Sequence, residues 1–396
     1  MKKERILFVV SRFLDGGLDT VLVNYLNAFA NLHSEVQVTI AIMVQYDGLE
    51  VFIDRVPKTV NIIHLVSGKW LTANVVKRYE GTISKSAKIF DELFFNAIRR
   101  QLIKRRLRGL QRENDVIIDF DSQARSFIDF DLPTLKIAYF HFSIGYLKRT
   151  NARYMDRVAR GLMAYDKIIC LCNDMYEECK KAYPNLADKL VVIYNPIDIA
   201  QIEKMSEVGI SDTFFRDRYI LASMRLEESQ KDLTTLIKAY AILRKEDITR
   251  VWLPRLIVIG DGPHREKLQR TIDECGLHED VILYGFVKNP YAIMSHAEMI
   301  VHSAKYEGFG MVVAEAIALG LAVVCTNCPV GPREVLADGK AGMLIPVGDE
   351  KSMAKAIKQI LTNEPLRYKY KTQAKQYAER FSTKNVVEKL LSVCNG

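Results

Sequence analysis

The sequence lacks any apolar run long enough to cross a membrane, because none approaches the roughly 20 residues that a spanning helix needs. The apolar run Ile6–Val10 near the start is too short for a signal peptide and is better explained as a first strand. Low-complexity tracts and short repeats are also missing. We therefore expect a cytoplasmic protein, either free or bound peripherally to the inner face of the cytoplasmic membrane.

Disulfide and dinucleotide signatures are missing as well. The 7 cysteines are odd in number and scattered, which argues for reduced thiols and against a disulfide framework. Cys325 and Cys328 form a Cys-x-x-Cys pair, but a metal or redox site would need a second ligand pair or a thioredoxin-like context. No Gly-x-Gly-x-x-Gly fingerprint occurs, which disfavours a nicotinamide cofactor.

The composition is that of an ordinary globular protein, with 49% hydrophobic and 26% charged residues. A chain of 396 residues exceeds what one core usually holds, so two domains of about 190 residues are expected. The net charge of +8 is unevenly distributed. Between Lys85 and Arg112 there are nine Lys or Arg residues, against two acidic residues, Asp91 and Glu92.

Strand-like apolar runs alternate with helical periods along the whole chain, which predicts parallel sheets wrapped by helices. The turn-rich sequence Asn195-Pro196-Ile197-Asp198 interrupts this alternation, which then restarts. We therefore predict an α/β chain with two doubly wound, Rossmann-like domains, residues 1–197 and 198–380. The predicted strands are residues 6–10, 36–43, 116–119, 135–140, 167–171 and 190–194 in the first domain, and 219–223, 255–259, 281–284, 299–302 and 321–325 in the second.

The segment from Glu307 to Glu315 carries the most chemical information. Its two carboxylates bracket Gly308-Phe309-Gly310, just after a strand-like run. Glycines let backbone N–H groups approach an anion, and the apolar run that follows predicts a buried helix whose N-terminus favours phosphate. One carboxylate could then face a sugar ring and the other a ribose. From these residues alone, a plain strand–loop–helix junction with two surface glutamates is an equally good interpretation.

Further motifs decide between these two interpretations. They are Gly16-Gly17, His141 in Tyr-Phe-His-Phe, Asn195-Pro196-Ile197-Asp198, Arg225 with Lys231, Gly260-Asp261-Gly262-Pro263, Tyr284-Gly285-Phe286 and Gly331-Pro332-Arg333-Glu334. In order and spacing, the chain resembles the retaining glycosyltransferases of family 4, of the bacterial surface-glycan type. These enzymes have the GT-B fold, in which two Rossmann-like domains face a central cleft, and a Glu-x7-Glu signature. The resemblance also implies that a helix in residues 381–396 returns to the first domain.

The resemblance assigns roles to these residues. Arg225, Lys231 and the helix N-terminus would neutralise the donor diphosphate, so that no metal ion is needed. Glu315 would bind the ribose, and the loop Tyr284–Val287 would contact the base. The predicted donor-binding residues are Gly16, Gly17, Arg225, Lys231, Phe286, Val287, Gly308, Phe309, Gly310, Met311 and Glu315, and the predicted catalytic residues are Glu307 and His141. His296 and His302 lack recognisable partners and are expected to be structural.

The implied reaction is retaining, metal-independent transfer of a hexose or N-acetylhexosamine from a nucleotide sugar, with a UDP-sugar as the expected donor. The implied acceptor is a lipid-linked oligosaccharide, lipopolysaccharide or another surface glycan. Two other functions stay open: a non-catalytic GT-B partner subunit and a sugar-nucleotide epimerase. The intact set of candidate residues disfavours the first, and the Glu-x7-Glu arrangement disfavours the second.

Residues 84–112 predict a basic amphipathic helix, which could lie on an anionic membrane surface. A domain helix with a solvated basic face is an equally good alternative. Nucleic acid is disfavoured, because no aromatic-interleaved basic platform accompanies the charge. The segment combines the apolar residues Ile89, Leu93, Phe94, Phe95, Ile98, Leu102, Ile103 and Leu107 with the basic residues Arg99, Arg100, Lys104, Arg105, Arg106 and Arg108.

Overall fold

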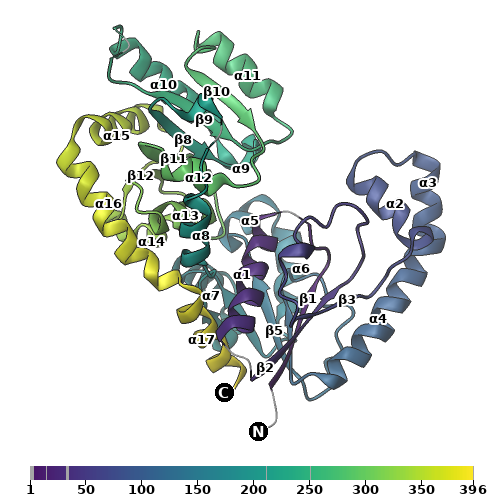
Figure 1. Cartoon of the computed structure of the whole chain (residues 1–396). Coiled ribbons are helices and arrows are strands. Elements are labelled where there is room, and N and C mark those ends of the chain that lie inside the picture. The colour runs from purple at the N-terminus through teal and green to yellow at the C-terminus, as the bar shows by residue number, and fades with distance from the viewer. Residues whose placement is uncertain (1–3, 15, 33–34, 211, 250, 396) are drawn as a thin grey trace.

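Two parallel sheets organise the chain in the computed structural model, which describes residues 4–14, 16–32, 35–210, 212–249 and 251–395 (Figure 1). The first sheet has 7 strands in the order β3-β2-β1-β4-β5-β6-β7. The second has 6 strands in the order β10-β9-β8-β11-β12-β13. The predicted α/β architecture of two Rossmann-like domains is confirmed.

The first domain is built on the first sheet. Phe8, Val9 and Val10 are consecutive in β1 and all fully buried, so both faces of the sheet are covered. Its strands are β1 (Glu4–Val10), β2 (Val36–Ile42), β3 (Asn61–His64), β4 (Val116–Asp119), β5 (Leu135–Phe140), β6 (Lys167–Cys170) and β7 (Leu190–Val192). Its helices are α1 (Gly17–Leu32), η1 (Ile53–Arg55), α2 (Lys69–Tyr79), α3 (Lys85–Phe90), η2 (Asp91–Phe95), α4 (Asn96–Glu113), α5 (Ile144–Thr150), α6 (Ala152–Leu162), α7 (Asn173–Ala182) and η3 (Pro184–Lys189).

The second domain repeats this pattern on the second sheet. Its strands are β8 (Tyr219–Ser223), β9 (Arg255–Ile259), β10 (Val281–Gly285), β11 (Met299–His302), β12 (Val323–Thr326) and β13 (Met343–Ile345). The helices are α8 (Ile199–Ser206), η4 (Thr213–Phe215), α9 (Glu228–Lys231), α10 (Leu233–Glu246), α11 (Arg265–Glu274), α12 (Pro290–Ser295), α13 (Met311–Ala318), α14 (Pro332–Val335), η5 (Ala337–Gly339), α15 (Glu350–Thr362), α16 (Glu364–Ala378) and η6 (Glu379–Phe381). Helix α17 (Thr383–Cys394) follows them and packs against α1 of the first domain.

The strand order reverses at one point in each sheet. In the first sheet this point lies between β1 and β4, and in the second between β8 and β11. Open α/β sheets bind ligands outside the carboxyl ends of the strands at such a point. Candidate site residues are therefore expected in the loops that follow β1, β4, β8 and β11.

The chain passes between the domains twice. It first leaves the first domain after β7, and Ile197 donates a backbone hydrogen bond of 2.6 Å to the carbonyl of Phe381, where the chain returns. Tyr194 and Phe309 both contact the Phe381 ring, with ring centroids 5.0 and 5.2 Å away. Figure 1 shows α16 and α17 running down one side of the molecule to α1, and the buried face of α17 consists of Val386, Val387 and Leu390.

Two strands were not predicted from the sequence, β3 and β13. Both lie at sheet edges, with 4 and 3 residues. An edge strand needs no long apolar run, because one side of it is not covered by a neighbouring strand. No helix among the described residues combines the length and the apolar character that a membrane span requires.

The prediction of a helix over residues 84–112 is confirmed in outline, because residues 85–113 are helical throughout, but the π-helical turn η2 interrupts the α-helical pattern between α3 and α4. Its apolar residues also face two ways. Ile103 and Leu107 are buried on the same face of α4 as Arg99, whereas Leu93 and Phe94 are 68% and 56% exposed. Arg99 donates to both Asp91 oxygens and to the Leu71 carbonyl, and Arg106 donates to the Leu65 carbonyl. Arg99 and Arg106 therefore bind inward and stabilise the domain.

Candidate active site

Glu307 lies in the loop after β11 and is held from the second domain itself. It is 7% exposed, and its Oε1 atom contacts both the Lys231 ammonium and His302 Nε2, the latter at 2.8 Å. Burial alone would raise the pKa of Glu307, but Lys231 and His302 lower this pKa to about 2. Glu307 is thus an anion at neutral pH. Its second oxygen, Oε2, has no hydrogen-bond partner among the described residues.

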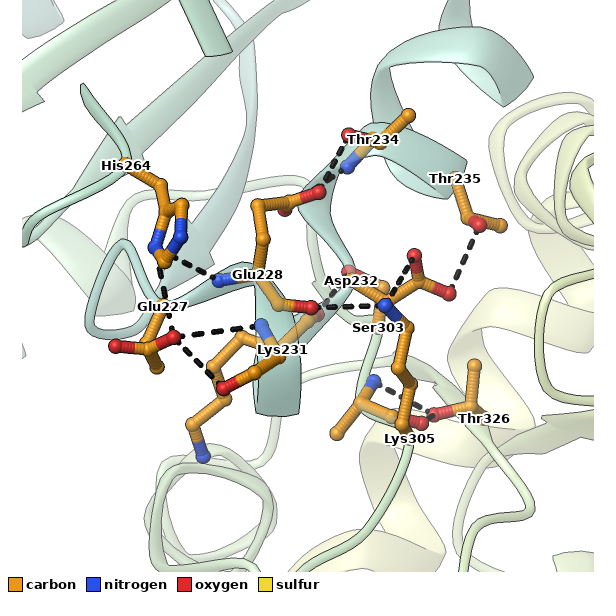
Figure 2. Close-up of polar contacts among 12 residues, drawn as sticks. Glu227, Glu228, Lys231, Asp232, Thr234, Thr235, His264, Ser303, Lys305 and Thr326 are labelled. Carbon is orange, nitrogen blue, oxygen red and sulfur yellow. Dashed lines mark hydrogen bonds and ion pairs between the residues drawn. The ribbon is translucent and has the colours of Figure 1, made fainter. Parts of the chain in front are cut away.

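The loop that carries Lys231 is fixed to the loop that carries Glu307. Figure 2 shows this network: Ser303 Oγ donates to the Lys231 carbonyl at 3.0 Å, and Lys305 Nζ donates to the Glu228 carbonyl at 2.8 Å. Glu228 is buried and accepts hydrogen bonds from Thr234. The main chain around Lys231 is therefore rigidly placed, whereas the lysine side chain keeps its rotatable bonds.

Arg225 follows β8, and its side chain is exposed without a hydrogen-bonding partner in the described part of the chain. Two glycines allow its loop to lie close to the loop after β9. A Cβ atom on Gly260 would be 2.1 Å from the Met224 carbonyl oxygen, and one on Gly262 would be 2.7 Å from the Leu226 carbonyl oxygen. These glycines of the Gly-Asp-Gly-Pro motif thus place Arg225 by close backbone contact.

Helix α13 begins directly after Gly308-Phe309-Gly310. Gly310 has φ of 93°, which a residue with a Cβ adopts only under strain, and no side chain caps the helix start. The first N–H groups at Met311 therefore lack a side-chain acceptor, as an anion-binding helix N-terminus requires. The Phe309 side chain points away from this helix start, because it is 2% exposed and packs on Tyr194 and Phe381. Phe309 can therefore contact a donor only through its backbone.

Glu315 lies one helical turn into α13 and is 8% exposed. Its Oε1 atom accepts a hydrogen bond of 3.1 Å from the Tyr291 hydroxyl. Burial raises the pKa of Glu315 to about 7, although the Tyr291 hydrogen bond opposes this shift. In the loop after β10, the edge strand of the second sheet, Phe286 is 69% exposed and Val287 is half-buried. This loop therefore presents an open apolar surface.

His141 and Gly308 bring the two domains into contact. A Cβ atom on Gly308 would lie 1.8 Å from the His141 carbonyl oxygen, so the backbones touch at this point. His141 Nε2 donates to the Phe120 carbonyl at 2.6 Å, and burial lowers the pKa of His141 to about 4, so the ring is neutral. Beside this contact, the Tyr146 and Tyr306 rings stack with centroids 3.7 Å apart. These interdomain contacts could not be read from sequence, because they join residues more than 150 positions apart.

Gly16 and Gly17 lie at the start of α1, after β1. The Gly16 N–H donates to Asp19 Oδ2 at 2.8 Å, so this group is already satisfied. A Cβ atom on Gly17 would meet no atom within 4 Å. Gly17 therefore borders open space, whereas Gly16 serves the helix start.

The Gly331-Pro332-Arg333-Glu334 motif also joins the domains. Glu334 accepts hydrogen bonds from the Asn173 backbone at 2.7 Å and from the Tyr194 hydroxyl at 2.6 Å, and Arg333 pairs with Asp174. Next to it is a cavity of about 400 Å³ between α7 and the loop after β12. Its lining consists of Asp174, Glu177, Glu178, Lys181, Asn327, Cys328, Pro329 and Val330.

Two Asp-x-Asp sequences, a pattern that holds a metal ion in some enzymes, occur in the first domain at residues 119–121 and 129–131. The Asp119 carboxylate accepts from the Tyr165 hydroxyl and the Ala124 backbone, and that of Asp121 accepts from Ser11. Asp129 is paired with Arg108 at 2.7 Å. These three carboxylates are thus engaged by the first domain itself.

Part of the second domain matches a known family model. Residues 210–377 match the family model described as glycosyl transferases group 1. The chain is 34% identical over 208 residues to N-acetylgalactosamine-N,N'-diacetylbacillosaminyl-diphospho-undecaprenol 4-alpha-N-acetylgalactosaminyltransferase of Campylobacter jejuni, a match that covers 52% of this chain and 54% of the relative. It is 22% identical over 392 residues, 98% of each chain, to GalNAc-alpha-(1->4)-GalNAc-alpha-(1->3)-diNAcBac-PP-undecaprenol alpha-1,4-N-acetyl-D-galactosaminyltransferase of the same organism.

Among solved structures, HepE of Anabaena in complex with UDP and glucose superposes with a TM-score of 0.72, at 18% identity and 99% coverage of both chains. This similarity shows the fold, which is GT-B as predicted. The chain spans about half or less of the length of the first curated relatives that it matches.

Proposed function

We propose that the protein transfers a hexose or N-acetylhexosamine from a nucleotide sugar, with retention and without a metal ion. The match of residues 210–377 to the group 1 glycosyltransferase model supports the reaction class. The observation that carries this proposal is the Glu307 carboxylate. It is ionised, nearly buried, and has one free oxygen beside the backbone contact between Gly308 and His141. Such a carboxylate can stabilise positive charge on a sugar ring as its bond to phosphate breaks.

The charge on the leaving diphosphate is met by three groups in this proposal. Arg225 is exposed and unpaired among the described residues, the Lys231 ammonium contacts the Glu307 carboxylate, and α13 has an uncapped N-terminus. Together they supply positive charge where negative charge develops, which is the role that a divalent cation has in other enzymes. We assign the ribose to Glu315 and the base to the loop of Phe286 and Val287.

The proposed donor is a UDP-sugar, and the proposed acceptor is a lipid-linked oligosaccharide, lipopolysaccharide or another surface glycan. Both assignments draw on similarity: HepE was crystallised with UDP, and the two Campylobacter relatives are named for transfer to undecaprenol-linked glycans. The cavity of about 400 Å³ beside α7 is lined by carboxylates and an amide, which accept hydrogen bonds from sugar hydroxyls.

Donor hydrolysis in the presence of EDTA tests the proposal. Purified protein is incubated with UDP-, GDP- and ADP-sugars, and the released nucleotide is measured. We expect hydrolysis of one UDP-sugar, undiminished by EDTA and absent from Glu307→Gln protein purified in the same way. If no sugar nucleotide is hydrolysed and calorimetry detects no nucleotide binding, the result would instead support a non-catalytic partner subunit. Conversion of a UDP-sugar to its epimer would support an epimerase.

We also propose that the first domain binds anionic membranes through a cluster of exposed apolar residues on α2, α3, η2 and α4. Figure 1 shows these helices at the right side of the molecule, at the opposite side from α17. The cluster is the exposed set Trp70, Ile89, Phe90, Leu93, Phe94 and Ile98. The Phe90 and Phe94 ring centroids are 4.6 Å apart, and Phe95 connects Trp70 to Phe90, with ring centroids 5.9 and 5.6 Å away. Exposed patches of this kind mark interaction sites, and the same helices carry exposed basic residues at 69, 77, 85, 88 and 100.

The triple variant Trp70→Ser, Leu93→Ser, Phe94→Ser should bind phosphatidylglycerol vesicles about tenfold or more weakly than the wild type, because each large side chain contributes roughly 1.5–3 kcal/mol when buried. Vesicle sedimentation measures this difference. Ile248→Ser, Val251→Ser, Tyr368→Ser is the matched control, since these residues are 86%, 76% and 70% exposed but lie outside the cluster. Equal vesicle binding by both triple variants would refute the membrane proposal. Donor hydrolysis should be unchanged in both.

A further inference from the structure

His302 was expected to be structural, but it contacts the candidate catalytic carboxylate. It is the last residue of β11, which pairs with β8 at the point where the strand order reverses. The side chain is 1% exposed, and its Nε2 atom lies 2.8 Å from Glu307 Oε1. Because the Glu307 carboxylate is ionised and can only accept, Nε2 must carry the hydrogen and donate.

The other ring nitrogen, Nδ1, is buried without a hydrogen-bond partner among the described residues. A buried polar atom without a partner costs free energy, so a histidine that served only to fill the core would be a poor choice here. Neighbouring β12 places Cys325 opposite His302, and the charged groups around the ring are those of Lys231 and Glu307. The favourable contact of the imidazole is therefore the one with Glu307.

Lys231 and His302 hold the same carboxylate oxygen, but only one of them can leave it. The Lys231 side chain is flexible, and under the proposed function its ammonium is drawn to the donor diphosphate. His302 belongs to strand β11, so its ring cannot move away with the lysine. The Ser303 and Lys305 hydrogen bonds in Figure 2 keep the backbone on both sides in place while the lysine turns.

We propose that His302 is a positioning residue, which keeps Glu307 Oε1 fixed and Oε2 directed at the reacting sugar once Lys231 binds the diphosphate. The inference rests on the proposed function. It predicts that the hydrogen bond from the Nε2 position matters for turnover and contributes little to donor binding.

Two amide substitutions test the inference, because they differ in reach. In His302→Gln the amide nitrogen can occupy the Nε2 position and donate to Glu307, whereas in His302→Asn the shorter amide reaches only the Nδ1 position. We expect His302→Asn to lower kcat for donor hydrolysis about tenfold or more, with KM changed less than about threefold, and His302→Gln to stay within about threefold of the wild type. His278→Gln, an exposed histidine on the same domain, is the matched control.

Thermal unfolding and calorimetric binding of the donor's nucleoside diphosphate establish that each variant is folded. If His302→Asn does not fold, His302→Leu takes its place, since it fills the site without a polar atom. The inference is overturned if the variant that lacks a hydrogen-bond donor at the Nε2 position keeps the wild-type kcat. It is also overturned if His302→Gln loses as much kcat as His302→Asn. An inactive wild type refutes the proposed function, whereas an active wild type with indifferent His302 variants refutes this inference alone.

Discussion

Replacing Gly308 with alanine should lower transfer and donor hydrolysis about a hundredfold while the chain stays folded. The added Cβ atom would be 1.8 Å from the His141 carbonyl oxygen and 2.8 Å from its carbon, far inside van der Waals contact. Both partners are backbone atoms, so no side chain can rotate away. The loop of Gly308 is fixed within its own domain by the hydrogen bonds of Ser303 and Lys305. The clash is therefore relieved by moving the domains apart.

A displacement of about 1 Å at a reacting centre is enough for a loss of this size. Activity, nucleotide binding and thermal unfolding of Gly308→Ala are the measurements. Gly209→Ala is the matched control, because a Cβ atom there would meet no atom within 4 Å. If Gly308→Ala retains wild-type turnover, the contact between Gly308 and His141 does not belong to the active arrangement.

Glu315→Gln should make the folded protein more stable at pH 8, by about 3 kcal/mol. The pKa of Glu315 is raised from 4.5 to about 7 by burial, so the folded state holds this proton more tightly than the unfolded state does. Wild-type stability therefore falls as the pH rises from 4.5 to about 7, and the loss is complete above that range. Glutamine stays neutral throughout and can still accept the hydrogen bond from Tyr291.

Chemical denaturation of both proteins across this pH range tests the expectation. The difference in unfolding free energy should vanish near pH 4.5 and grow toward pH 8. Glu266→Gln, which changes an exposed carboxylate on α11, should follow the wild-type curve. A difference that does not vary with pH would indicate a packing effect instead. A buried carboxyl that lowers stability at neutral pH is expected where the group serves a ligand, which here is the proposed ribose.

The central strands could be predicted almost residue by residue, whereas contacts between elements could not. Parallel strands covered on both faces appear as short apolar runs, so β4, β5, β8, β9 and β11 begin and end where the sequence predicts. The π-helical turn within residues 84–112 was not predicted, but the inward position of Arg99 could have been. Arg99, Ile103 and Leu107 are four residues apart, which places the arginine on the buried face of α4.

The candidate site shows the same limit. The Glu307 to Glu315 segment and Lys231 were identifiable from spacing, but the spacing does not say that the lysine and the carboxylate pair with each other. His302 could have been found by asking which side chain ends the strand before Glu307, because strand ends at a reversal of strand order line ligand sites. The tyrosine stack between Tyr146 and Tyr306 depends on how the domains meet, and no local pattern encodes that.

The return of α17 to α1 affects the order in which the chain can be completed. During synthesis the strands of the first domain emerge early, but the side chains that cover α1, at Val386, Val387 and Leu390, emerge only after the second domain. Until then the apolar surface of α1 is open to chaperones or to another nascent chain. The first domain thus completes its fold only after the second domain has been made, so the two domains depend on each other during synthesis as well as at the candidate site.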